Sequence, residues 1–218
     1  MGLTVHSIPS PAGAAVQDAQ RTRKGRWTML ALAVVCLLPV LASYFSYYVV
    51  RPDGRRNFGE LIDPQRSLPA LAATDLSGHP VPLESLKGQW LLVSVSSGVC
   101  AEICQQNLYL QRQLRESLGR EKDRLDWVWL INDGERVPET LRPALSAATV
   151  LRVPPETLDQ WLAAAPGRQL AEHLYVVDPM GNWMMRFPAS MEAEGAAKAK
   201  RDLDRLLRAS VSWDEPGR

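Results

Sequence analysis

The chain has 218 residues, of which 46% are hydrophobic and 22% are charged, and its formal net charge is +1. This near-neutral balance, without a basic stripe interleaved with aromatic residues, argues against a nucleic-acid-binding protein. Three cysteines are too few for a scaffold stapled by disulfides, so a globular part must hold itself together with its own core.

Residues 1–26 are rich in Pro, Ala and Ser and have no apolar period, which predicts a disordered tail. Residues 27–50 carry no charge and are long enough to cross a bilayer as a transmembrane helix. A cleaved signal peptide is the alternative. An aromatic cluster at the far end, with no small-residue cleavage site, favours an uncleaved anchor.

Basic residues flank this span on both sides, four before it and three after it. The small excess before the span predicts a cytoplasmic tail and a C-terminal domain in the periplasm of a bacterial cell, anchored by a single pass through the inner membrane. Residues 51–67 contain Pro52, Gly54 and Pro64, and we expect them to form a linker.

Residues 68–218 alternate between strand-like and helix-like segments, as one domain of ordinary size would. We expect a hairpin of residues 71–74 and 81–83, strands at 90–95, 125–131 and 149–153, helices at 101–118, 138–145, 155–162 and 196–207, and a late hairpin of residues 173–177 and 183–187. This order predicts an α/β, thioredoxin-like fold preceded by the transmembrane helix.

The spacing Cys100-x-x-x-Cys104 follows the apolar strand at 90–95 and opens the helix behind it. Cys100 is expected at or just before the helix N-terminus, where the helix dipole favours a thiolate, and Cys104 lies one turn further on the same face. Two such sulfurs can close a disulfide or bind a soft cation such as Cu(I). A purely structural pair of cysteines is the simpler alternative. No other cysteine lies beyond the span, which favours a pair with a redox or metal-binding role.

Several segments together resemble the Sco/SenC family of membrane-anchored, thioredoxin-fold proteins. They are the cysteine pair, the opening hairpin with Leu76-Ser77-Gly78 and Leu86-Lys87-Gly88, the acidic stretch from Asn132 to Leu141, the segment Tyr175-Val176-Val177-Asp178-Pro179-Met180-Gly181, and the single anchor. The resemblance implies a role in cytochrome c oxidase assembly. It implies copper as the metal, and as partner the copper-bearing subunit of the oxidase or another copper chaperone.

The family's third copper ligand is a histidine about five residues before the tyrosine of the late strand, where this chain has Leu170. His173, two residues before Tyr175, is the nearest candidate, so the resemblance gives Cys100, Cys104 and His173 as metal ligands. The prolines that the family places after each cysteine are replaced by Ala101 and Gln105.

Two thiolates suffice for Cu(I), whereas Cu(II) calls for a nitrogen ligand as well. Met180, Met184 and Met185 could offer thioethers, but methionines at a hairpin more often serve packing.

Three functions remain open at this point. The first is oxidase assembly through Cu(I) handling, or through reduction of the oxidase cysteines, with Cys100 attacking and Cys104 resolving. The second is a general membrane-tethered thiol–disulfide oxidoreductase, and the third is a non-catalytic assembly scaffold. No Ser-His-Asp set, phosphate-binding loop or zinc-type spacing supports a hydrolase or a nucleotide enzyme.

Overall fold

The structure is a computed structural model that describes residues 11–50, 57–212 and 214. The chain divides into two compact units, residues 1–56 and residues 57–218, and each is described by itself.

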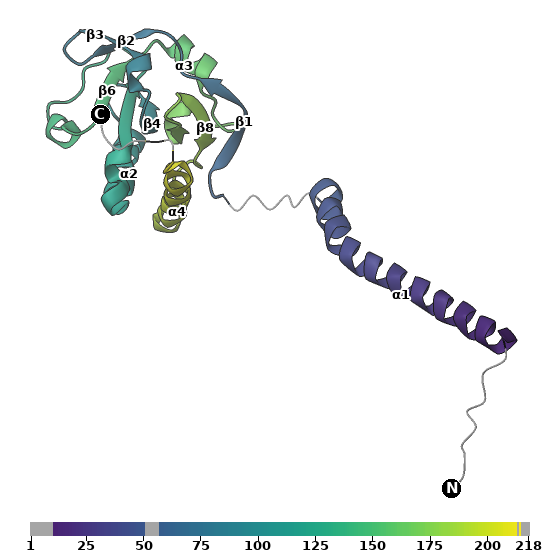
Figure 1. Ribbon diagram of the computed structural model, residues 1–218. Coiled ribbons are helices and arrows are strands. Elements are labelled where there is room, and N and C mark those ends of the chain that lie inside the picture. Colours follow the sequence, from purple (N-terminus) through teal and green to yellow (C-terminus); the bar gives the residue numbers. More distant parts are fainter. Residues whose placement is uncertain (1–10, 51–56, 213, 215–218) are drawn as a thin grey trace. The chain divides into compact units, whose positions relative to one another are not determined.

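The first unit is a single long helix, α1 (Pro11–Phe45), continued by the π-helical turn η1 (Ser46–Val50) (Figure 1). The segment Thr22–Val49 is long and apolar enough to cross a membrane, and among the described residues it is the only such segment. It contains nearly all of the predicted span. Because α1 begins at Pro11, the prediction of disorder was wrong for residues 11–26; residues 1–10 lie outside the described residues.

The second unit is built around one eight-stranded sheet with the strand order β1-β8-β7-β4-β5-β6-β2-β3. The strands are β1 (Glu60–Ser67), β2 (Ala72–Asp75), β3 (Pro80–Pro82), β4 (Trp90–Ser96), β5 (Leu125–Ile131), β6 (Thr149–Arg152), β7 (Leu174–Val177) and β8 (Asn182–Arg186). The helices are α2 (Glu102–Ser117), α3 (Pro155–Trp161) and α4 (Ala193–Ser210), with short 3₁₀ turns η2 (Leu83–Leu86), η3 (Gly119–Arg124), η4 (Arg142–Leu145) and η5 (Leu170–Glu172).

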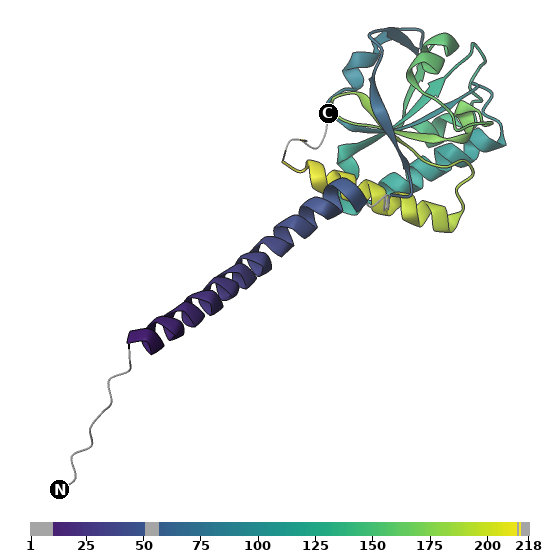
Figure 2. The ribbon, with the colours of Figure 1, turned by 90° about the vertical axis from the view of Figure 1, so that its right-hand side faces the viewer.

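Strand β4 lies at the centre of the sheet, parallel to β5 and antiparallel to β7. All seven of its residues are buried, because helices cover both faces of the sheet. Successive side chains alternate between the faces: Leu91 and Val93 pack with α3, whereas Trp90 and Leu92 pack beneath α2 and α4. Figure 2 shows α2 and α4 on the same face of the sheet.

Three sequence predictions for this unit need correction. Residues 60–67, placed in a linker, form the edge strand β1, which pairs antiparallel with β8. The globular unit therefore begins at residue 57 rather than at residue 68. The helix predicted at residues 138–145 is reduced to η4, which begins at Arg142.

Candidate functional site

The segment between β4 and α2 makes a tight turn that carries Cys100. The backbone N–H of Cys100 donates to the carbonyl oxygen of Ser97 over 3.1 Å, and Cys100 has a φ of +53°. Few residues other than glycine adopt this left-handed conformation, so the turn holds Cys100 in an unusual backbone state immediately before the helix. Helix α2 then begins at Glu102.

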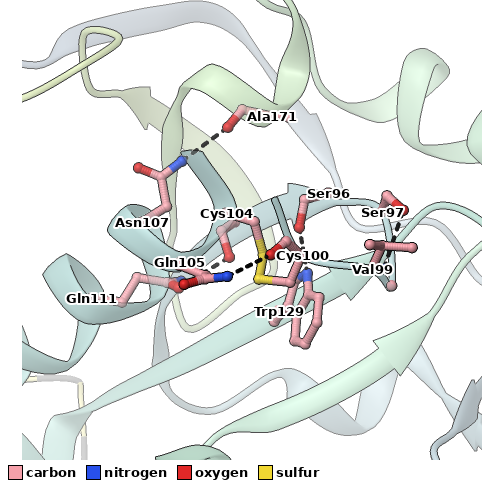
Figure 3. The surroundings of a disulfide bond; sticks show 12 residues. Ser96, Ser97, Val99, Cys100, Cys104, Gln105, Asn107, Gln111, Trp129 and Ala171 are labelled. Atoms are coloured by element: carbon pink, nitrogen blue, oxygen red, sulfur yellow. Dashed lines mark hydrogen bonds between the residues drawn. A yellow bond between two sulfur atoms is a disulfide. The ribbon is translucent and has the colours of Figure 1, made fainter. Parts of the chain in front are cut away.

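Cys100 and Cys104 form a disulfide, with their Cα atoms 5.0 Å apart (Figure 3). The side-chain amide of Gln105 donates to the carbonyl oxygen of Cys100 over 3.0 Å and ties the first turn of α2 to the cysteine before it. The two sulfurs thus lie together at the N-terminus of a helix, where the unpaired N–H groups and the dipole favour a thiolate after reduction.

The disulfide is buried under apolar side chains. Cys100 is 1% exposed and Cys104 is 5% exposed. They share a core cluster with Leu108 of α2, with Trp127, Trp129 and Ile131 of β5, and with Val137, Leu145 and Val150. Val137 and Leu145 belong to the connection between β5 and β6, so this connection contributes to the apolar cluster that contains the sulfurs.

A polar network fixes the strand end beneath the disulfide. The indole N–H of Trp129 donates to the hydroxyl of Ser96 over 2.7 Å (Figure 3). One turn further along α2, Asn107 donates to the carbonyl oxygen of Ala171 over 2.9 Å and joins the helix to the segment before β7. These bonds orient the helix N-terminus on the sheet.

His173 lies just before β7 and is 2% exposed. The backbone N–H of Ala165 donates to its Nε2 over 3.2 Å, and its Nδ1 is 2.9 Å from the carbonyl oxygen of Phe187. These partners assign the proton to Nδ1 and use both ring nitrogens. Burial, more than any other influence, holds the pKa of His173 below its usual value.

The ring of His173 therefore offers no free lone pair to a metal. Within the described residues, no group of three or more His, Cys, Asp or Glu side chains is arranged to hold a metal ion. The predicted three-ligand set is thus not assembled in this structure. Of the methionines, Met185 is buried in the core and Met180 is exposed on a turn.

The acidic stretch after β5 contains a residue whose role the sequence did not reveal. Oδ1 of Asp133 accepts the backbone N–H groups of Gly98 at 2.9 Å and Glu135 at 3.1 Å. Burial alone would raise the pKa of Asp133. Hydrogen bonds from the Ser97 hydroxyl and from these two N–H groups outweigh burial and hold its pKa below the usual range. Because β4 and β5 are parallel, their carboxyl ends meet at one edge, and this was the signal that could have placed Asp133 beside the cysteine turn.

Residues 90–210 match the sequence model of a family described as "transmembrane-like, thioredoxin-like, C-terminal domain". No curated protein matches the chain.

Among solved structures, that of apo Sco1 from Thermus thermophilus is 19% identical with a TM-score of 0.50, and the match covers 70% of this chain and 96% of that one. BsSco, described as having a disulfide switch and as a member of the Sco family of cytochrome c oxidase assembly proteins, is 16% identical with a TM-score of 0.50, covering 69% and 96%. A putative protein disulfide isomerase from Bacteroides thetaiotaomicron is 13% identical with a TM-score of 0.51, covering 72% and 97%. These likenesses confirm the predicted thioredoxin-like fold.

Proposed function

Because the chain belongs to the family of transmembrane-like, thioredoxin-like C-terminal domains, we propose that it is a membrane-anchored thiol–disulfide exchange protein with a Sco-like role in cytochrome c oxidase assembly. The observation that carries the proposal is the bond between Cys100 and Cys104 at the N-terminus of α2. A pair that closes and opens reversibly at this place can pass two electrons to or from a client.

In the reducing direction, the Cys100 thiolate attacks one sulfur of a client disulfide. The client S–S bond breaks, a mixed disulfide forms, and the second client sulfur leaves as a thiolate. Cys104, as a thiolate, then attacks Cys100, which releases the client dithiol and restores the Cys100–Cys104 disulfide. The client gains two electrons, and a dithiol reductant must return them to this pair before the next cycle.

The proposed client is the copper-bearing subunit of the oxidase, whose copper-site cysteines must be reduced before they bind metal. Three features support this assignment: the family membership, the anchor, and the likeness of the fold to BsSco. We place the globular unit in the periplasm, with α1 in the bacterial inner membrane. Alkaline phosphatase fused after residue 218 should be active there and inactive if the orientation is reversed.

Transient carriage of Cu(I) is the second candidate function. Once reduced, the two sulfurs would face each other in an apolar cluster, and two thiolates satisfy Cu(I) without a third ligand. Copper is then a cargo passed to the oxidase subunit or received from another copper chaperone. His173 is not part of this proposal, because both of its ring nitrogens are already used.

The test is to equilibrate the full chain in detergent with thiol redox buffers and to count free thiols by alkylation and mass spectrometry. We expect a two-electron transition in the range of about −120 to −270 mV that exchange proteins occupy. It should be lost in Cys100→Ser and Cys104→Ser and kept in the control Cys36→Ser, which lies in α1. A pair that stays oxidised below about −300 mV would be structural.

Two further measurements separate the alternatives. The reduced chain is titrated with Cu(I) against a competing chelator. A 1:1 complex that disappears in Cys100→Ser supports copper carriage. Oxidase assembly is then measured in cells carrying the two cysteine variants, and normal assembly in both would favour a non-catalytic scaffold.

A further inference from the structure

Each cycle of the proposed exchange function, on which this inference rests, requires a dithiol reductant to reach the Cys100–Cys104 disulfide. A thiolate must approach a disulfide sulfur along the S–S axis, so exchange depends on access. Here Cys100 is 1% exposed and Cys104 is 5% exposed, so an attacking thiolate has almost no access to either sulfur in this structure. Some part of the surrounding structure has to move before exchange takes place.

The cover segment, residues 132–148, is the element best suited to move. It supplies Val137 and Leu145 to the cluster around the sulfurs, and its one regular element is the short turn η4. The other sides of the cluster come from helix α2, from β5 at the centre of the sheet and from Val150 of β6. Segments with few regular hydrogen bonds and many exposed residues open at lower free energy than central strands.

Two charged side chains hold the start of the cover segment in place. Arg152, at the end of β6, donates from Nη1 to the carbonyl oxygen of Asp133 over 2.9 Å and from Nη2 to that of Glu135 over 2.7 Å. The carboxylate of Asp133 in turn accepts the backbone N–H of Gly98, two residues before Cys100. The cover is thereby tied both to β6 and to the turn that carries the cysteine.

The approach of the cover to this turn is so close that it requires a glycine. A Cβ at Gly98 would clash with the carbonyl oxygen of Glu135 and lie 3.3 Å from Oδ1 of Asp133. The φ of Gly98 is not in the left-handed range, so the close contact, not the backbone conformation, would oppose a larger residue. Gly134, inside the cover, would meet nothing within 4 Å.

We propose that Asp133 and Arg152 are positioning residues that hold residues 132–148 over the Cys100–Cys104 disulfide, so that exchange proceeds through a transiently opened form. In that form a thiolate of the dithiol reductant attacks one sulfur, the Cys100–Cys104 bond breaks, and the other sulfur leaves as a thiolate. The second thiolate of the reductant then resolves the mixed disulfide and leaves Cys100 and Cys104 reduced for the next client. These contacts of Arg152 and Asp133, called the latch below, set the fraction of time for which the two sulfurs can be attacked.

The test measures the rate at which dithiothreitol reduces the disulfide of the full chain in detergent, followed by alkylation and mass spectrometry. Arg152→Ala removes the latch, and Gly98→Ala pushes the cover away without changing a charge. When opening is fast, the rate follows the open fraction, and one lost hydrogen bond of this kind is worth about tenfold. We therefore expect both variants to be reduced about tenfold faster or more.

Matched controls accompany each variant. Arg142→Ala removes an exposed arginine of the same segment, whose partner is Glu139 on the surface, and Gly134→Ala adds a methyl group where there is room. Both should be reduced at the wild-type rate. Arg152→Lys cannot bridge two carbonyl oxygens as a guanidinium does, so its rate should lie between those of the wild type and Arg152→Ala.

Circular dichroism identifies any variant that fails to fold, and the rates of the folded ones decide. Equal rates of reduction in the wild type, the folded latch variants and the controls would overturn the proposal that residues 132–148 restrict access to the disulfide. They would leave the proposed exchange function unaffected. A wild-type disulfide that is reduced as fast as in the urea-unfolded chain would also overturn the proposed role of residues 132–148. A pair that resists reduction even in Arg152→Ala and Gly98→Ala overturns the exchange function and the cover with it.

Discussion

Arg124 and Asp214 form a buried ion pair, with Nη2 of Arg124 2.7 Å from Oδ2 of Asp214 and side-chain exposures of 6% and 0%. Arg124 ends η3, next to β5, and also donates to the carbonyl oxygen of Leu207 near the end of α4. The hydroxyl of Ser210 bonds both partners and accepts the indole N–H of Trp90. This pair therefore links Asp214, just after α4, to η3 and, through Ser210, to Trp90 of β4.

Asp214→Ala should destabilise the protein by about 3 kcal/mol or more, because it leaves a buried guanidinium without its buried partner. Urea denaturation of the full chain in detergent measures this free energy. Glu121→Ala is the control: Glu121 pairs with the same arginine, but its side chain is 47% exposed, and its loss should cost less than about 1 kcal/mol. Equal effects of the two substitutions would mean that Asp214 adds nothing beyond a surface pair.

Gln111 is a buried polar residue of α2 that the sequence analysis did not single out. It stands in a helix rich in polar residues, yet it is 0% exposed. Its amide donates to the carbonyl oxygens of Leu92 and Val128 over 2.7 and 3.0 Å, and it accepts the Ser94 hydroxyl over 3.0 Å. A buried polar bridge of this kind depends on strands that are distant in sequence, so helical periodicity alone does not predict it.

Gln111→Leu should cost about 1–3 kcal/mol in urea denaturation, because it leaves the Ser94 hydroxyl buried without this acceptor. Adding Ser94→Ala to Gln111→Leu should recover part of the loss, since two apolar partners of similar shape leave no such unpaired group. Gln106→Leu, on the exposed face of the same helix, is the control and should stay within about 0.5 kcal/mol of the wild type. A double variant less stable than the single one would contradict the pairing.

The elements that could be predicted from the sequence are those whose own side chains are buried. The run Trp90–Ser96 is apolar and lies in the middle of the sheet, and the pair Cys100 and Cys104 was placed correctly at the start of a helix. Strand β1 was missed because Glu60–Ser67 is polar, contains Pro64 and is mostly exposed. Its place comes from backbone pairing with β8, for which the sequence carries no pattern.

The candidate site divides in the same way. The spacing of the two cysteines is local and predicted that the sulfurs would meet. Val137 and Leu145 share the apolar cluster with the sulfurs from a connection distant in sequence, and the spacing of the cysteines did not indicate them. Parallel pairing of β5 with β6 likewise brings Arg152 to the carbonyl oxygens of Asp133 and Glu135. His173 was named as a ligand because it is the histidine nearest to Tyr175 in the sequence, whereas its two ring nitrogens are used by the backbone of Ala165 and Phe187.

The disulfide should add little to the stability of the fold. Its closed loop is short, for which chain entropy gives about 2 kcal/mol at most. The double variant Cys100→Ala/Cys104→Ala should therefore remain folded, with a free energy of unfolding lower by about that amount in urea. The wild type under reducing conditions is the natural comparison. Global unfolding of either would assign the pair a structural role and weaken the proposed exchange function.

His173 makes stability depend on pH in a predictable direction. Its folded-state pKa is lowered, mainly by burial, from the value of 6.5 expected in the unfolded chain. The unfolded chain thus takes up the proton first as the pH falls. The stability that neutral His173 supports is present above pH 6.5 and is lost as the pH drops below 6.5 towards the folded pKa. This loss should appear in urea denaturation between about pH 5 and 7, a window chosen above the usual carboxylate range.

His173→Gln should remove this part of the pH dependence, because glutamine can still donate and accept but does not titrate. The baseline stability of the variant should fall by about 1–3 kcal/mol if the two backbone partners are imperfectly satisfied. His79→Gln removes the exposed histidine that lies 3.3 Å from Asp75 on the β2–β3 turn, and it measures separately what that turn contributes to the slope. An unchanged slope in His173→Gln would show that another group takes up the proton, and the buried neutral histidine would then not be the cause.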